Sequence, residues 1–160
     1  MSETEDLREL YQDMILDHGR HPRHFHSIED ADCEAVGHNP LCGDKLILFL
    51  KLGEEGKIEE ASFQGDGCAI SVAAASLMTD MLQGKTATQA RQLWAYFKAL
   101  TMGDAYAQED KAKLDEDDVD RLQSLAGVRH YPVRVKCATL AWRTLEAALD
   151  PDAEKEIGTE

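Results

Sequence analysis

The sequence predicts an α+β domain in which a small antiparallel sheet of three strands packs against several helices. Segments with alternating apolar residues are confined to one part of the chain, residues 34–64. Helical apolar spacing dominates both before and after that part. The regular alternation of strand and helix that builds parallel sheets is missing from the pattern. An antiparallel sheet covered by helices therefore fits best.

Length and charge indicate one acidic domain. The 160 residues suit a single domain. The chain carries 17 basic and 31 acidic residues, a formal charge of -14, so neither nucleic acid nor membrane is expected as a partner. No apolar run approaches the roughly 20 residues that span a bilayer, and the acidic start does not resemble a signal peptide. We expect a cytoplasmic domain over residues 1–150 and a flexible tail over residues 151–160.

A first helix is expected over about Glu3–His18, followed by a histidine-rich segment. Ser2 and Glu5 have the spacing of a capping box, and Gly19 is a typical residue just after a helix. The four imidazoles of residues 18–26 could bind a metal, or the segment could be a solvated loop. Because no cysteine or acidic ligand is interleaved, we favour the loop.

Three strands follow. Side chains of residues Lys45–Leu52 alternate between two faces, one of them made of leucines, which predicts a strand. The turn at residues 53–56 returns the chain as Lys57–Gln64, which predicts a hairpin. A short strand around Glu34–Gly37 adds the third. One face of the long strand carries four leucines: Leu46, Leu48, Leu50 and Leu52.

The rest of the chain is mainly helical. Ala69–Leu82 is apolar nearly all round, which predicts a central helix, and Gly84 ends it. Residues 101–114 are polar without a clear period and are expected to form a connection. Further helices are expected from about Ala87 to Leu100 behind a Thr86–Gln89 capping box, from a cap at Asp115 to near Gly127, and from Pro132 to about Leu149.

Four cysteines stand out in this acidic chain, and four reduced structural thiols are the simplest interpretation. Nothing indicates export, so disulfides are not expected. No pair has the CxxC spacing of zinc ribbons or thioredoxins. Cys33 lies between Asp32 and Glu34, whose carboxylates disfavour a thiolate, and we interpret it as a bystander.

The other three cysteines lie in surroundings that suit a metal. Cys42 and Asp44 can face the same side of an extended chain, and Cys68 starts the central helix, whose dipole favours a thiolate. Arg134, one turn before Cys137, and Lys136 beside it are both expected to help keep that thiol ionised. Three thiolates and a carboxylate suit zinc and are acceptable for iron or an iron–sulfur cluster. The oxygen ligand favours a site that exchanges its ligands over a permanent structural site. A structural zinc site and the absence of any metal remain the alternatives.

Short motifs occur in order along most of the chain: Leu10-Tyr11, Asp17-His18, Pro22-Arg23, Leu41-Cys42-Gly43-Asp44, Gly65-Asp66-Gly67-Cys68-Ala69-Ile70-Ser71 and Lys136-Cys137-Ala138-Thr139-Leu140-Ala141-Trp142. With them the chain resembles the SufU branch of the IscU/NifU-N iron–sulfur assembly family over about Leu10–Leu149. Scaffold members carry Leu-Pro-Pro-Val-Lys before the last cysteine and a histidine beside it. Here His130-Tyr131-Pro132-Val133-Arg134 and Lys136 stand instead, and residues 101–125 fit the insertion of the SufU branch.

The resemblance implies an IscU/SufU-like fold and a zinc site made by Cys42, Asp44, Cys68 and Cys137. It implies that Cys42 accepts persulfide sulfur from a SufS-type cysteine desulfurase and passes it to a downstream iron–sulfur assembly complex. Arg134 is expected to pair with Asp44 when a partner residue enters the coordination sphere. Two alternatives stay open: a scaffold that builds a [2Fe–2S] cluster, and a structural zinc module. The acidic surface predicts a partner with a basic patch around its active site.

Overall fold

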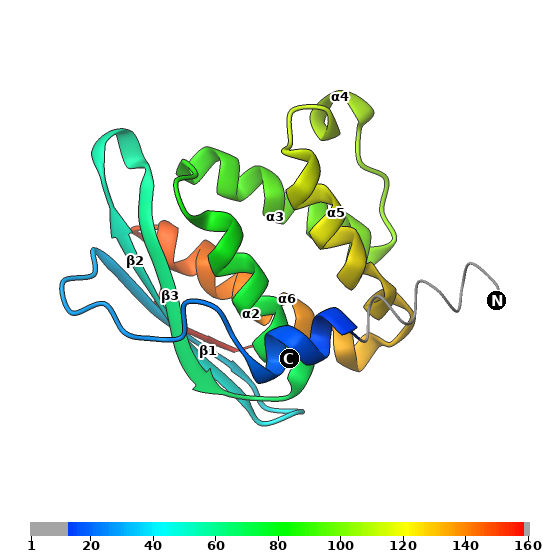
Figure 1. Cartoon of the computed structure of the whole chain (residues 1–160), viewed down its shortest axis with the longest axis horizontal. Helices are drawn as coiled ribbons and strands as arrows, with labels where there is room; N and C mark the ends of the chain where they lie inside the picture. The colour runs from blue at the N-terminus through cyan, green and yellow to red at the C-terminus, as the bar shows by residue number, and fades with distance from the viewer. Residues whose placement is uncertain (1–12, 159–160) are drawn as a thin grey trace.

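A sheet with helices packed on one face forms the protein in the computed structural model, which describes residues 13–158 (Figure 1). The strands lie in the order β3-β2-β1-β4, and β1, β2 and β3 pair antiparallel. Their bounds are β1 (Cys33–Asn39), β2 (Asp44–Leu52), β3 (Ile58–Asp66) and β4 (Glu156–Gly158). The predicted α+β class, with its antiparallel hairpin and short first strand, is confirmed.

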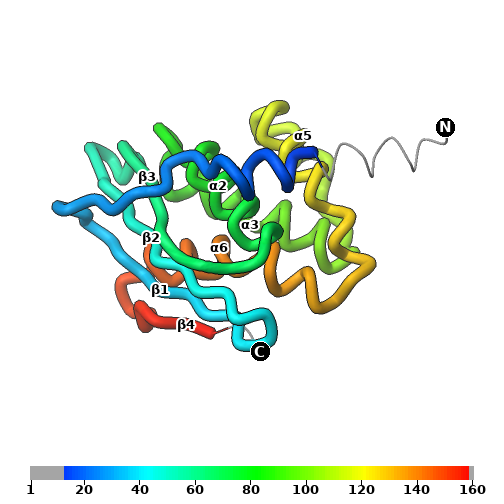
Figure 2. The backbone as a smooth tube through the Cα atoms, turned by 60° about the horizontal axis from the view of Figure 1, so that its bottom comes forward, coloured from blue at the N-terminus to red at the C-terminus, as the bar shows by residue number. Residues whose placement is uncertain are grey.

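The prediction of three strands was wrong, because β4 adds a fourth. This strand falls in the segment that was expected to be a flexible tail, and it runs parallel to β1 (Figure 2). The backbone N–H of Val36 donates to the carbonyl of Lys155 over 2.6 Å, and the Lys155 ammonium donates to the carbonyl of Ala147 over 2.7 Å. A strand of three residues held by backbone bonds carries too little side-chain alternation to be recognised in a sequence.

The helices after the sheet follow the predicted order. Their bounds are α2 (Ala69–Leu82), α3 (Ala87–Met102), α4 (Gln108–Lys111), α5 (Glu116–Leu125) and α6 (Pro132–Leu149). The capping box of Thr86 and Gln89 is present, and the Asp115 carboxylate accepts from the backbone of Asp117 and Asp118. The expected connection contains the short helix α4, and a 3-10 turn (Ala126–His130) leads into α6.

The N-terminal helix differs at its end. It continues to residue 20, one residue past Gly19, within the described part of the chain. The expected start at Glu3 and the capping residues Ser2 and Glu5 lie outside the described residues. None of the helices in residues 13–158 is long and apolar enough to cross a membrane.

The core lies between the sheet and the helices α2 and α6. Three of the four leucines on the inner face of β2 are at most 3% exposed, and Leu52 is partly buried. Trp142 of α6 is fully buried and stacks on Trp94 of α3, with ring centroids 6.2 Å apart. α6 also packs directly on β1 and β2, so the start of α6 stays beside the turn that joins these two strands.

Candidate metal centre

The turn between β1 and β2 builds the first wall of the site. Asn39 and Asp44 are the last paired residues of the two strands, so their side chains lie next to each other. Residues 40–43 close the turn, where Gly43 adopts a φ of 71° that favours glycine. The N–H of Cys42 donates to the carbonyl of Asn39 over 3.3 Å. Cys42 is therefore held at the tip of the turn, partly exposed to solvent.

The start of α6 supplies the second wall. Cys137 is fully buried in the second turn of α6, and its sulfur lies 3.2 Å from that of Cys42. The ligand atoms of Cys42, Asp44 and Cys137 all lie within 4.8 Å of one another. Two sulfurs at about 2.3 Å from a tetrahedral zinc are about 3.8 Å apart, which is wider than the 3.2 Å found here. The donor set therefore suits a zinc ion once the two sulfurs move slightly apart.

Cys68 lies at the edge of this group rather than in it. It caps the N-terminus of α2, and its sulfur accepts from the N–H of Ser71 over 3.5 Å. Its own N–H donates to Oδ1 of Asp44 over 2.7 Å. Its backbone thus touches the donor cluster, the name used here for Cys42, Asp44 and Cys137. The structure therefore brings three of the four expected ligands together, and the Cys68 sulfur caps its own helix while its side chain still hydrogen-bonds to that of Cys137.

Two glycines allow the backbone that leads into α2 to lie close to Lys45 and Asp44 at the start of β2. A Cβ at Gly67 would lie 2.7 Å from Oδ1 of Asp44, and one at Gly65, whose φ is 152°, would overlap the carbonyl of Lys45. Both positions therefore require the small residue, since side chains need more room. The Asp44 carboxylate, only 2% exposed, lies against the backbone that leads into α2.

The electrostatics of Cys137 differ from the expectation that a neighbouring cation keeps it ionised. Burial raises the pKa of the Cys137 thiol, and the hydrogen bond with Cys42 and the nearby Cys68 raise that pKa further. Arg134 does contact this thiol: the hydrogen bond to Cys137 raises the pKa of the exposed guanidinium. One surface arginine does not offset the burial of the sulfur. A divalent cation within the cluster would supply the positive charge that favours the thiolates.

Asn39 is a site residue that sequence reasoning missed. Its side-chain nitrogen donates to Oδ2 of Asp44 over 3.1 Å and to the sulfur of Cys137 over 3.5 Å. The signal was present: extending the expected strand Glu34–Gly37 by two residues pairs Asn39 with Asp44. The contact with Cys137, by contrast, joins residues 98 positions apart and has no local signature.

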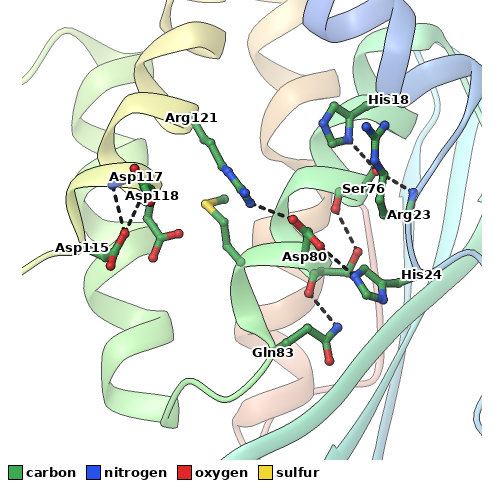
Figure 3. Close-up of polar contacts among 12 residues, drawn as sticks. His18, Arg23, His24, Ser76, Asp80, Gln83, Asp115, Asp117, Asp118 and Arg121 are labelled. Carbon is green, nitrogen blue, oxygen red and sulfur yellow. Dashed lines mark hydrogen bonds and ion pairs between the residues drawn. The ribbon is translucent and has the colours of Figure 1, made fainter.

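The histidine-rich segment belongs to a different structural role. Figure 3 shows His18 bound to the hydroxyl of Ser76 and His24 bound to the carboxylate of Asp80, both on α2. Partial burial lowers the pKa of His18. In residues 13–158 the segment contributes to no group of metal-ligating atoms. These imidazoles dock the N-terminal helix and the following loop onto α2.

Cys33 lies in β1, away from the donor cluster. Burial raises the pKa of its thiol, and Asp32 acts in the same direction. Cys33 is not among the residues that could share a metal within the described chain.

Comparison with known proteins agrees with this architecture. The family model of the NifU-like N terminal domain matches residues 10–138. The zinc-dependent sulfurtransferase SufU of Bacillus subtilis is 36% identical over 146 residues, covering 91% of this chain and 93% of that protein. The iron–sulfur cluster assembly scaffold protein IscU of Streptococcus pyogenes serotype M1 is 35% identical, covering 94% and 89% respectively.

Solved structures show the same fold. An iron–sulfur cluster assembly scaffold protein for the SUF system, from Fervidobacterium islandicum AW-1, superposes with a TM-score of 0.78 at 31% identity, covering 89% of this chain and 98% of that one. An N-terminal NifU-like protein from Brucella abortus superposes with a TM-score of 0.75 at 19% identity, covering 88% and 92%, which bears on the fold alone. The chain thus belongs to the NifU-like N-terminal domain family of iron–sulfur cluster assembly proteins.

Proposed function

We propose that this protein is a zinc-dependent sulfurtransferase of iron–sulfur cluster assembly. It takes sulfane sulfur from the persulfide of a SufS-type cysteine desulfurase and hands it to a downstream iron–sulfur assembly complex. The observation that carries the proposal is the position of Cys42: it belongs to a buried donor cluster, yet it stands at the tip of an exposed turn. The name of the Bacillus subtilis relative supports the same activity.

The chain offers four donors for zinc. Cys42, Asp44 and Cys137 already lie together, and Cys68, whose side chain hydrogen-bonds to that of Cys137, completes the set from the start of α2. When bound, zinc supplies the positive charge that keeps the thiols deprotonated without redox chemistry. The four cysteines form no disulfide in the described residues, so the three of this donor set remain available as ligands.

Cys42 acts as the nucleophile. Its thiolate attacks the outer sulfur of the donor persulfide, so one S–S bond forms on Cys42 as the S–S bond of the donor breaks. The electron pair of the broken bond leaves on the donor cysteine as a thiolate, and no oxidant is needed. Arg134, exposed and bonded to Cys137, is free to swing to the carboxylate of Asp44 when Cys42 leaves the cluster. That contact compensates the carboxylate charge during transfer.

This protein presents a surface on which the desulfurase can dock. Leu41, Tyr131 and Val133 are 64%, 60% and 51% exposed, and they flank Cys42 and the start of α6. Exposed apolar side chains grouped around a reactive residue are typical of a protein contact. Arg129 and Arg134 add positive charge to the same segment. We call these five residues the site rim.

A scaffold that builds a [2Fe–2S] cluster uses the same donors, and the IscU relatives favour it by name. A structural zinc module is less well supported, because a structural site is closed and Cys42 is partly exposed at a turn. Metal analysis and a visible spectrum of the purified protein distinguish these functions. Colourless protein with one zinc supports sulfur transfer, whereas brown, oxygen-sensitive protein supports the scaffold.

The direct test is desulfurase turnover with and without this protein. Stimulation is expected for the unchanged protein and is expected to be lost for Cys42→Ala and Asp44→Ala. Cys33→Ala serves as a matched control, since Cys33 lies outside the donor cluster. Full stimulation by Cys42→Ala would overturn the proposal.

A further inference from the structure

We propose that Asn39 is a positioning residue that locks two of the clustered donors, Asp44 and Cys137, and leaves Cys42 as the donor that moves. The inference rests on the proposed metal site but not on sulfur transfer, so metal binding alone tests it. Asn39 is the last residue of β1, and the two donors come from β2 and α6. One side chain thus joins three elements at the site.

The contacts of the amide use both of its protons. The nitrogen lies 3.1 Å from Oδ2 of Asp44 and 3.5 Å from the sulfur of Cys137. A primary amide has two N–H donors, so each acceptor receives its own hydrogen bond. Hydrogen bonds to the ligand atoms of a metal site orient those ligands and raise metal affinity.

The burial of Asn39 indicates that its side chain is oriented by the hydrogen bonds that its N–H groups donate. Asn39 is fully buried, and within the described residues its Oδ1 has no hydrogen-bond partner. Turning the amide over would place that oxygen against the Asp44 carboxylate and a sulfur, both of which are acceptors. The orientation is therefore set by Asp44 and Cys137, and a buried acceptor is left unpaired to keep it.

The three clustered donors differ in how firmly they are held. Asp44 is bound at both oxygens, by Asn39 at Oδ2 and by the N–H of Cys68 at Oδ1 over 2.7 Å. Cys137 is held by α6 and by Asn39. Cys42 stands on a turn of four residues and is partly exposed; its backbone N–H donates to the carbonyl of Asn39 and its sulfur lies against that of Cys137, but its sulfur receives no bond from the side-chain amide of Asn39. When a partner approaches, the weakly held Cys42 leaves while Asp44 and Cys137 stay.

Metal binding by substituted proteins tests this assignment. Asn39→Leu keeps the branched shape with bulkier methyl groups and cannot form the hydrogen bonds, and Asn39→Ala truncates the side chain at Cβ. Both are expected to weaken zinc binding about 10- to 100-fold in competition with a chromophoric chelator. The Co²⁺-loaded proteins should also show altered d–d absorption bands, because the Asp44 carboxylate loses its orientation. Ser62→Ala is the control, since Ser62 is another buried polar residue of the sheet with an unpartnered oxygen.

A second measurement uses the unchanged protein and so does not depend on a variant folding. Asn39 is the only asparagine of the chain, so asparagine-selective ¹⁵N labelling gives one side-chain amide pair. Adding Zn²⁺ is expected to shift that pair strongly, with both protons slow to exchange with water. Zinc affinity and Co²⁺ bands equal to those of the control, or an amide signal that ignores zinc, would overturn the assignment. Loss of sulfur transfer with these results intact would count against the proposed function alone.

Discussion

Gly67 controls how the Asp44 carboxylate is seated. This residue precedes the cap of α2, and the room of a missing side chain lets the carboxylate reach the N–H of Cys68. A Cβ there would lie 2.7 Å from Oδ1 and 3.2 Å from the carboxyl carbon of Asp44. The backbone at Gly67 is not in the left-handed region, so the constraint is steric contact with the donor rather than strain.

Substituting Gly67→Ala is therefore expected to weaken zinc binding by about tenfold while the fold is kept, because Asp44 must shift to make room. Competition with a chelator measures the affinity, and circular dichroism checks the fold. Gly19→Ala is the matched control, since the nearest atom to its new Cβ lies at an ordinary 3.5 Å. Equal zinc affinity for both variants would contradict this account of Gly67.

At the scale of elements, Asp80 on α2 joins three parts of the chain. His24 of the loop after the N-terminal helix bonds to one carboxylate oxygen over 2.9 Å, and Arg121 of α5 bonds to the other over 2.8 Å (Figure 3). Partial burial acts to raise the pKa of Asp80, but the bonds from His24 and Arg121 outweigh it and hold that pKa below its usual value. The carboxylate thus ties the N-terminal segment and α5 to the central helix.

Asp80→Asn is expected to destabilise the protein by about 1 kcal/mol at pH 7, or about 2–4 °C in Tm, allowing for solvent access to the pair. Because folding lowers the pKa of Asp80, its contribution is present above the ordinary value of 3.8 and is lost as the pH falls through the lower folded value. Thermal unfolding at several pH values measures the gap between the two proteins, which should close in acid. Asp120, an exposed residue beside Arg121 on α5, is the control, and Asp120→Asn should unfold at the same temperature as the unchanged protein. A stability difference for Asp80→Asn that does not change with pH would refute the link between its stability and the pKa of Asp80.

The whole molecule combines a strong negative charge with a local positive field. The net charge is -14, yet residues 121–145 contain five of the 17 basic residues and none of the 31 acidic ones. Part of this stretch forms the site rim, where Arg129, Tyr131 and Val133 are exposed. The expectation that the partner surface is basic followed from the total charge and stays a prediction. The local charge favours acidic groups on the partner around its persulfide.

Reversing the charge of single residues distinguishes an acidic partner surface from a basic one. Arg129→Glu is expected to slow association with the desulfurase on the order of 2- to 10-fold at low salt, an effect that high salt removes. Stopped-flow or biosensor kinetics measure the rate. Lys57→Glu changes the net charge equally at the opposite end of β2, and is expected to have little effect. A similar change in rate for both variants would mean that total charge decides association.

The sequence by itself determined the helices and the three main strands, because periodicity, caps and turn residues are local properties of the chain. It also pointed to Cys42, Asp44, Cys68 and Cys137 through their neighbours. Only the tertiary structure decided that Cys68 turns to cap α2, that β4 completes the sheet, and that Asn39 bridges Asp44 and Cys137. The physical reason is that β4 and the Asn39 bridge depend on pairing between segments about 100 residues apart, and the Cys68 side chain depends on a choice of rotamer. Neither leaves a repeating pattern in the sequence.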